Sequence, residues 1–343
     1  MRLTPRRLAI PGAAIALTGI AACGSSTSSG AGSSASPTTG SAQPSGGMKG
    51  GGSGMNMAGA PDCTPVPKLA AAPRRIVTMD AGAAAFVQRL GAGDQLVGTA
   101  APDFRDAFTG VARGDLDKVK VIDPGRGNRE AVLAAKPDFV TGISVYELGS
   151  FDGNPTAEQL AENDIAAYVA CPSTAPVTDL TPTYKYVNDL ATLVGRPSAG
   201  RQLVATMTKQ AGSRSGDTPV LALSSVPTGG QGISTRGATS LANGIITLAG
   251  GKNVAESVKA DMAQLSAEQV SLANPKVIVA VSGLGPQTDK ELVDAIKASP
   301  LLQSTDAVKS GNVVAVPQSI MLSPSVLNPQ AVSTVADAVA KAR

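Results

Sequence analysis

From residue 74 onward, short apolar runs alternate with stretches of helical periodicity, and this alternation limits the possible folds more than any other feature of the chain. It favours parallel sheets with helices packed on both faces. We expect strands over residues 76–79, 96–99, 119–122, 139–143, 166–169, 220–224, 277–281 and 313–316. We expect helices over residues 83–90, 129–135, 241–248, 267–273, 290–297 and 329–341. Gly91 follows the first of these helices, in the position where glycine commonly ends a helix.

The alternation is interrupted once, in the middle of the folded part. Two helical stretches, residues 183–194 and 198–213, follow one another with Gly195 and Pro197 between them. The strands then resume, so the sequence predicts an α/β protein of two lobes joined by a helix. The predicted boundaries are a first lobe over 66–197, a connecting helix over 198–214 and a second lobe over 215–343.

A short phrase is repeated in the two lobes. Asn128 and Ser266 each precede a short helical stretch, and a glutamate stands at its second position, Glu130 and Glu268. Each stretch ends near a proline and runs into an expected strand. Asn128 and Ser266 are favourable N-cap residues, and Ser266 with Gln269 has the spacing of a capping box. The repeat therefore places two equivalent glutamates on equivalent helices of the two lobes.

The first residues have the layout of an export signal. Three arginines precede an apolar run over residues 8–22, which is too short to cross a bilayer easily. The run ends at Ile20-Ala21-Ala22-Cys23, which resembles the lipobox of bacterial lipoproteins. This resemblance implies that the signal peptide 1–22 is removed and that Cys23 carries a lipid anchor at the extracytoplasmic face of the cell membrane. The alternative is an ordinary secreted protein with a chance cysteine.

Residues 23–65 read as a tether rich in Gly, Ser and Ala, a composition that cannot bury enough apolar surface to fold. A flexible segment of this length reaches roughly 35 Å. Met48, Met55 and Met57 could bind a soft metal such as Cu(I), or could be methionines in a disordered linker. Beyond Cys23 the chain has two cysteines, Cys63 and Cys171, which we expect to form a disulfide in an oxidising compartment.

The chain contains no histidine and no tryptophan. The absence of histidine excludes Ser-His-Asp and Cys-His relays and histidine-rich metal sites. No nucleophile–base pair or phosphate-binding loop is visible either, and Asp115 and Asp117 read as a solvated acidic pair, so we expect no catalytic residues and no enzyme. The net charge is +3 and the basic residues are scattered, which argues against nucleic-acid binding.

Several phrases together resemble the class III (cluster A) substrate-binding lipoproteins of ABC importers, of the ferric-siderophore and cobalamin-binding type. The resemblance covers residues 74–343. The phrases are Arg74-Arg75-Ile76-Val77-Thr78 with Leu90-Gly91-Ala92-Gly93-Asp94, Asn128-Arg129-Glu130 with Lys136-Pro137-Asp138, Leu248-Ala249-Gly250-Gly251-Lys252-Asn253, and Leu265-Ser266-Ala267-Glu268 with Asn274-Pro275-Lys276.

This resemblance implies two Rossmann-like lobes, joined by a single long helix, with the ligand in the cleft between them. It also implies that Glu130 and Glu268 dock onto arginines of the importer's permease dimer, because paired exposed carboxylates suit a two-fold partner. The alternative for both is an acid that favours a helix N-terminus through the dipole. The implied protein is a monomer without a cofactor or a resident metal.

Ligands of open α/β sheets lie beyond the carboxyl ends of the strands. The loops expected there include Met79-Asp80-Ala81 and Ser282-Gly283-Leu284. Arginines in these loops would suit the oxygens of an anionic ferric chelate, unless they are solvated or held in structural ion pairs. The candidate ligand-binding residues are Arg105, Arg126, Tyr146, Arg236, Phe104, Thr239 and Gln318.

A ferric siderophore is the ligand class that the sequence favours. Haem remains an alternative through Tyr146 as an iron ligand, and cobalamin is a second alternative that the few aromatic residues disfavour. A third reading keeps the fold but assigns it to a cell-envelope interaction or sensor lipoprotein without transport. The sequence does not choose the ligand or the permease.

Overall fold

The first lobe contains a wholly parallel sheet. The computed structural model describes residues 63–228 and 232–343, and it orders this sheet β2-β1-β3-β4. The strands are β1 (Ile76–Thr78), β2 (Leu96–Thr99), β3 (Phe139–Gly142) and β4 (Ala166–Val169). All residues of the central strands β1 and β3 are buried, because helices cover both faces of a parallel sheet.

The second lobe repeats this plan. Its parallel sheet has the order β10-β9-β5-β7, and its central strand β9 is buried at every position. An antiparallel pair, β6 with β8, lies beside this sheet and places Ile233 opposite Leu265. The strands are β5 (Thr218–Leu223), β6 (Ile233–Arg236), β7 (Gly251–Asn253), β8 (Met262–Leu265), β9 (Val277–Ser282) and β10 (Val313–Pro317).

Short helices follow the strands, as in other α/β folds. In the first lobe they are α1 (Ala81–Arg89), α2 (Gly110–Asp117), α3 (Arg129–Ala134) and α4 (Ala157–Ala161), with 3-10 turns η1 (Gly93–Gln95), η2 (Pro102–Ala107) and η3 (Val145–Glu147). In the second lobe they are α7 (Leu241–Leu248), α8 (Ala267–Ala273), α9 (Asp289–Ala298), α10 (Asp306–Lys309) and α11 (Gln318–Met321).

The predicted helix ends are confirmed at the positions of the predicted capping residues. The Asn128 side chain accepts a hydrogen bond from the Glu130 amide, 2.8 Å away. Ser266 and Gln269 form the reciprocal capping box at the start of α8. Gly91 has φ of 74°, the left-handed conformation that only glycine adopts without strain, directly after α1.

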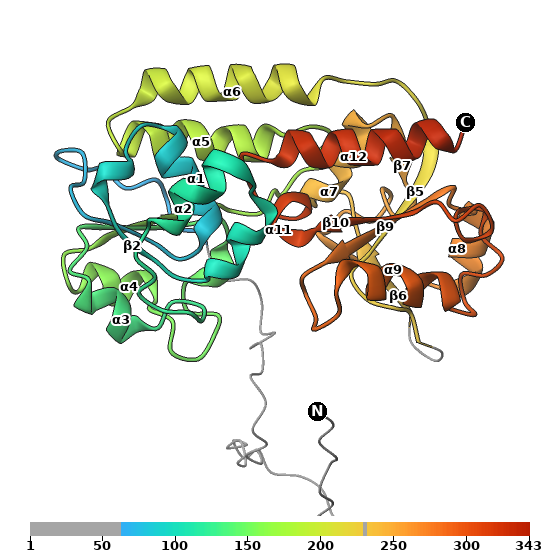
Figure 1. The fold of residues 1–343 in the computed structure, drawn as a ribbon, viewed down its shortest axis with the longest axis horizontal. Helices are drawn as coiled ribbons and strands as arrows, with labels where there is room; N and C mark the ends of the chain where they lie inside the picture. Colours follow the sequence, from blue (N-terminus) through green and yellow to red (C-terminus); the bar gives the residue numbers. More distant parts are fainter. Residues whose placement is uncertain (1–62, 229–231) are drawn as a thin grey trace, which may run out of the picture. The chain divides into compact units, whose positions relative to one another are not determined.

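Three longer helices lie on one side of the lobes: α5 (Thr181–Leu193) packs in the core of the first lobe, α12 (Asn328–Lys341) in that of the second, and α6 (Pro197–Ala211) against both of these helices. Figure 1 shows α6 running along the outer side of α5 and α12. Leu203 and Met207 of α6 belong to the core of the first lobe, whereas Ala211 belongs to the core of the second. The predicted fold class, two α/β lobes joined by a long helix, is thereby confirmed.

Three features differ from the sequence-based expectation. The strand expected over 119–122 is reduced to an isolated bridge between Thr99 and Val121. Asp115 and Asp117, which we expected to be a solvated pair on a loop, lie instead in α2, where they form ion pairs with Lys118 and Arg113. The antiparallel β6–β8 pair was not predicted, since its strands are short and pair only with each other.

Cys63 and Cys171 are joined by a disulfide, with Cα atoms 5.7 Å apart and a sequence separation of 108 positions. The bond links the start of the described chain to the residue that follows β4 by two positions. The signal peptide, Cys23 and the three methionines of the tether lie outside the described residues. Within the described part of the chain, none of the helices combines the length and the apolarity that crossing a bilayer requires.

Candidate functional site

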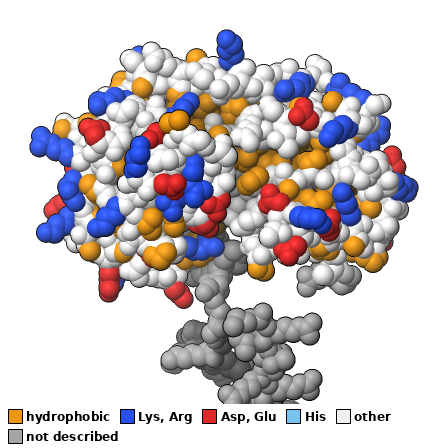
Figure 2. Space-filling model, viewed as in Figure 1, with side chains coloured by type: hydrophobic (Ala, Val, Ile, Leu, Met, Phe, Trp, Pro, Cys, Tyr) orange, Lys and Arg blue, Asp and Glu red, His pale blue; other side chains and the backbone are white. Residues whose placement is uncertain are grey.

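The loops at the carboxyl ends of the two parallel sheets carry the residues singled out in the sequence. In the first lobe these loops follow β1, β2 and β3, and in the second lobe they follow β5, β9 and β10. Figure 2 shows apolar side chains gathered where the two lobes meet on the face drawn. Two exposed apolar residues of the second lobe, Met262 and Leu284, stand beside candidate residues in these loops.

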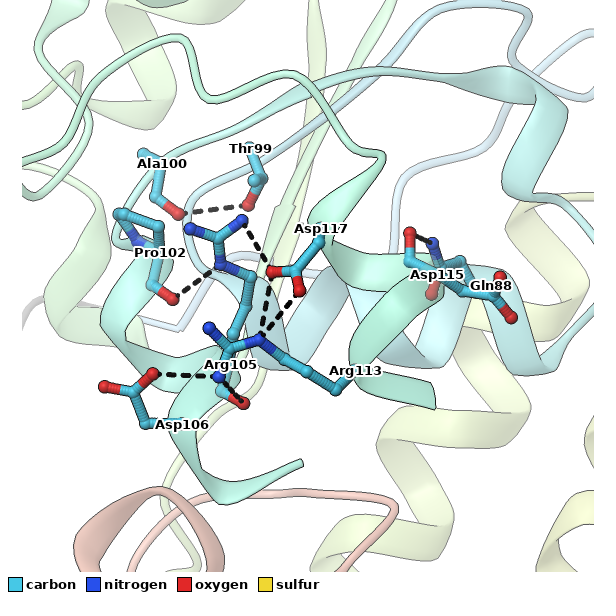
Figure 3. A network of polar contacts seen from close by, with 9 residues as sticks. All are labelled: Gln88, Thr99, Ala100, Pro102, Arg105, Asp106, Arg113, Asp115 and Asp117. Carbon is cyan, nitrogen blue, oxygen red and sulfur yellow. Dashed lines mark hydrogen bonds and ion pairs between the residues drawn. The ribbon is translucent and has the colours of Figure 1, made fainter. Parts of the chain in front are cut away.

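Arg105 is held by its own lobe. Its Nε donates a hydrogen bond to the Pro102 carbonyl at 3.0 Å, and Nη1 lies 3.3 Å from Asp117. Figure 3 shows Arg113 joining the same Asp117 carboxylate from α2. Because only 18% of the Arg105 side chain is exposed, its guanidinium serves this ion-pair network. The neighbouring Phe104 packs against the core of the first lobe.

Arg126 is the exposed arginine of the first-lobe loops. Its guanidinium lies 4.3 Å from the centre of the Phe151 ring, within the range of a cation–π contact. The loop around it is fixed by Asp123, whose carboxylate accepts hydrogen bonds from the amides of Gly125, Gly127 and Asn128. These hydrogen bonds lower the pKa of Asp123.

Tyr146 lies in η3, directly beyond the carboxyl end of β3, with 48% of its surface exposed. The sequence has four tyrosines, and the other three are buried or half-buried. Tyr168 and Tyr186 stack in the first-lobe core with ring centres 5.8 Å apart. Tyr146 is therefore the one tyrosine that presents its ring to solvent.

The second-lobe candidates are largely held by backbone groups and by an acid. Arg236, at the end of β6, forms an ion pair with Asp261 at 3.1 Å and contacts the Met262 sulfur at 2.9 Å. Thr239 is buried, and its amide donates to the Ala260 carbonyl. Gln318 donates a side-chain hydrogen bond to the Gly283 carbonyl at 2.7 Å, which links the loops after β9 and β10.

A buried acid pair lies under the first-lobe loops, and sequence reasoning missed its importance. Asp80 follows β1, caps α1 and is completely buried. Burial raises the pKa of Asp80 to about 6. Burial, with the nearby charge of Asp80, raises the pKa of Glu147 well above its usual range. Asp80 carried an N-cap signal before the small residues of α1, whereas nothing in the sequence around Glu147 indicates burial.

The two predicted docking residues stand at the second positions of α3 and α8. Glu130 and Glu268 are both exposed, and Figure 1 shows their helices at opposite ends of the described structure. Hydrogen bonds from the Ser266 side chain and the backbone lower the pKa of Glu268. Leu272 lies one turn after Glu268 and is 89% exposed. Glu130 helps to line a surface cavity of about 330 Å³ with Asn128, Arg129, Gly153, Asn154 and Gln159.

A second surface cavity, of about 490 Å³, lies near the amino end of β2 and is lined by residues such as Gln88, Leu96 and Lys118. This position is away from the strand ends that carry the candidate residues. Among residues 63–228 and 232–343, no cluster of three acidic, cysteine or histidine side chains has metal-binding geometry. The residues described offer no preformed metal centre.

Comparison with known proteins places this arrangement in a family. A family model described as periplasmic binding protein matches residues 76–320. No curated protein matches the sequence.

Three solved structures share the fold. A periplasmic binding protein from Veillonella parvula is 23% identical over 79% of this chain and 92% of its own, with a TM-score of 0.66. An Fe3+-hydroxamate transport protein from Saccharomonospora viridis is 22% identical over 78% and 93%, with a TM-score of 0.61. A haem-binding protein from Roseiflexus is 21% identical over 78% and 98%, with a TM-score of 0.59. The family match covers most of the folded part, and the chain belongs to the periplasmic binding protein family, as its sequence phrases predicted.

Proposed function

We propose that this protein captures a ferric siderophore outside the cell, in a cleft between its two lobes, and delivers it to an ABC importer. The observation that carries the proposal is the placement of Arg126 and Tyr146 beyond the carboxyl ends of the first-lobe strands, where open α/β sheets bind ligands. The membership in the periplasmic binding protein family supports the same function.

The chemistry of these loops favours an anionic chelate. Arg126 is free of carboxylate partners in the ion pairs of the described residues, so its guanidinium is available to a ligand oxygen. Arg236 is paired with Asp261 and only 13% of its side chain is exposed, so, like Arg105, it mainly holds its own lobe together. Tyr146, Met262 and Leu284 add exposed apolar surface, and Met262 contacts Arg236 directly. The fold is shared with a protein described as part of an Fe3+-hydroxamate transport system.

Haem is the second candidate. The exposed phenol of Tyr146 is a suitable axial ligand for haem iron, and no histidine competes for that role. A haem-binding protein also shares the fold. The two candidate ligands use Tyr146 differently. Haem would be bound through the phenol oxygen as an iron ligand, whereas a siderophore would only pack against the ring.

Titration calorimetry with ferrioxamine B, haem and cyanocobalamin tests the proposal. We expect ferrioxamine B to bind with a micromolar or tighter dissociation constant, and Arg126→Ala to weaken this binding by about tenfold, or ~1.4 kcal/mol. Arg201→Ala, which changes an exposed arginine on α6, is the matched control. Binding of haem alone, abolished by Tyr146→Phe, would replace the siderophore proposal with the haem one. Binding of none of the three would contradict both.

Docking to the permease is the second part of the proposal. Glu130 and Glu268 occupy equivalent helix positions, and Leu272 adds an exposed apolar side chain to the face of α8 that carries Glu268. A carboxylate beside an apolar anchor is suited to an arginine pocket with an apolar rim. The proposal also includes a lipid anchor at Cys23.

Uptake of radiolabelled iron as ferrioxamine B tests the docking residues. We expect Glu130→Arg with Glu268→Arg to abolish uptake, and Leu272→Asp to reduce it, with affinity for ferrioxamine B unchanged. Glu158→Arg is the matched control, because Glu158 is also exposed at the second position of a capped helix. Normal uptake by the double variant would remove these glutamates from the docking surface.

A further inference from the structure

Asp80 ties the start of α1 to the end of β3 through both oxygens of its buried carboxylate. Oδ1 accepts a hydrogen bond from the Ala83 amide at 2.9 Å, and Oδ2 accepts one from the Ile143 amide at 3.2 Å. These two donors stabilise the ionised form of Asp80. The ionised carboxylate can accept a further hydrogen bond through its remaining lone pairs, but it has no proton to donate.

The Glu147 side chain folds back from η3 against the end of β3. Its Oε2 lies so close to Gly142 that a Cβ at position 142 would overlap it, so the absence of a side chain there makes room for the carboxyl group. Oε2 is buried and receives no hydrogen bond. The Glu147 carboxyl also lies within hydrogen-bonding reach of Asp80, which is itself an acceptor. An ionised Glu147 would therefore place two buried acceptors against each other.

Among the residues that the structure describes, no basic side chain is paired with either carboxyl group, that of Asp80 or that of Glu147. On α5, the Tyr186 hydroxyl faces the pair and is hydrogen-bonded to Thr141 of β3 at 3.0 Å. Behind it, on β4, the Tyr168 hydroxyl donates to Asp189 of α5, which also binds Lys185.

The pair is also connected to both first-lobe candidates for ligand binding. Glu147 follows Tyr146 directly in η3. The buried Asn154 amide donates to the Glu147 carbonyl at 2.9 Å and to the Arg126 carbonyl at 2.8 Å. Arg126 directs its own guanidinium to the Phe151 ring. The main chain at Glu147 is thus linked through Asn154 to the loop that carries Arg126, and it continues directly from Tyr146.

We propose that Glu147 carries a proton which it donates to the Asp80 carboxylate, and that this shared proton fixes the Tyr146 turn and the Arg126 loop for ligand binding. The ligand-binding part rests on the proposed function, whereas the shared proton does not. Glu147 acts as a positioning residue, because the ligand would contact its neighbours. One proton on Glu147 is enough for the two buried carboxyl groups to form a hydrogen bond, because it converts one of the two facing acceptors into a donor.

The pH dependence follows from the direction of the shifts. Both carboxyl groups have raised pKa values in the folded protein, that of Asp80 to about 6. The folded state therefore binds more protons than the unfolded chain, in which the carboxyl groups have pKa values of about 4. Stability contributed by the pair is complete below about pH 4 and is lost as the pH rises through about 6 and above.

Infrared spectroscopy tests the shared proton directly. We expect the wild-type protein to show the carbonyl band of a protonated carboxylic acid at neutral pH, although exposed carboxyl groups are then ionised. Glu147→Gln should remove this band, and Glu162→Gln, which changes an exposed acid in the same lobe, should keep it. Absence of the band from the wild type at neutral pH would overturn the proposal without any variant.

Thermal unfolding at several pH values tests the consequence for the fold. We expect the wild-type midpoint to fall as the pH rises from about 5 to about 8, and the Glu147→Gln midpoint to change less. The glutamine amide donates to Asp80 at every pH, so it replaces the proton permanently. Equal pH slopes in the two proteins would contradict the proposal. If Glu147→Gln does not fold, Gly142→Ala, which displaces the carboxyl group, should also remove the infrared band.

Binding of ferrioxamine B at the same pH values tests the link to the cleft. We expect the wild-type affinity to fall several-fold between about pH 5 and about pH 8, and the Glu147→Gln affinity to stay constant. An infrared band with pH-independent affinity would refute the coupling to the cleft. A band with no binding of ferrioxamine B would refute the proposed ligand and leave the shared proton intact. Binding of ferrioxamine B without the infrared band would refute the shared proton and leave the proposed ligand intact.

Discussion

Each lobe has its own four-stranded parallel sheet, but the two lobes bury different polar groups. The first lobe buries two carboxyl groups, Asp80 and Glu147, and one of their oxygens receives no hydrogen bond. The second lobe buries an amide pair, Asn243 and Asn253, which are hydrogen-bonded to each other. Asn253 Nδ2 donates to the Arg236 carbonyl at 2.8 Å and to Asn243 Oδ1 at 2.9 Å.

The amide network is complete without a proton from solvent. Asn243 Nδ2 donates to the Val177 carbonyl, and Asn253 Oδ1 accepts from the Ala255 amide. An amide side chain brings both donors and acceptors, so two of them can face each other. Two carboxyl groups can do so only when one of them is protonated. The difference teaches that the same fold can make one lobe insensitive to pH and the other sensitive to it.

Removal of the disulfide is expected to give the largest effect on the comparison between lobes. The bond closes a loop of 108 residues within the first lobe, so Cys63→Ser with Cys171→Ser should lower the free energy of unfolding by about 4–5 kcal/mol. Urea unfolding would measure the loss. Hydrogen exchange should show the weakening in β4 before β9. Equal weakening of both sheets would mean that the lobes unfold as one unit.

Asn253→Ala should give the next largest effect, in the second lobe. It leaves the Arg236 carbonyl, Asn243 Oδ1 and the Ala255 amide without their partner, which should cost about 3 kcal/mol of stability. Urea unfolding at pH 5 and pH 8 should give the same loss, because amides do not titrate. Asn163→Ala, at an exposed residue, should change stability by less than about 0.5 kcal/mol. A loss that varies with pH would break the contrast between the lobes.

The repeated helix caps should give the smallest effect. Ser266→Ala breaks a reciprocal capping box, whereas Asn128→Ala removes a single hydrogen bond to the Glu130 amide. We expect a loss of about 1 kcal/mol for Ser266→Ala and a smaller loss for Asn128→Ala. Thermal midpoints of the two variants would measure the difference. A larger loss for Asn128→Ala would show that its loop, shared with Asp123 and Asn154, matters more than the cap.

The elements with strong local signals were predicted well. Helices α7 and α8 have the predicted bounds, because apolar periodicity and their serine caps fix them locally. Strand β2 and strand β4 were also placed correctly. The strand expected over 119–122 was not, since a strand needs a partner, and here only Val121 pairs with Thr99. The β6–β8 pair was missed for the same reason.

The candidate site was predicted only in part. Arg105 and Arg126 lie in the segments after β2 that the sequence indicated, because strand ends are visible as the ends of apolar runs, whereas Arg236 ends β6, a strand that the sequence did not predict. The sequence did not choose between ligand contact and structural pairing. Asp117, on a helix that the sequence did not predict, determines the role of Arg105, and Asp261 likewise pairs with Arg236.

The sequence by itself determined the two α/β lobes, the connecting helix, the repeated capped glutamates and the exclusion of imidazole chemistry, because these depend on composition and on local periodicity. Only the tertiary structure decided which charged groups face each other. Asp80 and Glu147 lie 67 positions apart in sequence. They meet only because β1 pairs with β3 and because Gly142 leaves room for the Glu147 carboxyl group. Burial then raises the pKa values of both groups, which no local pattern encodes.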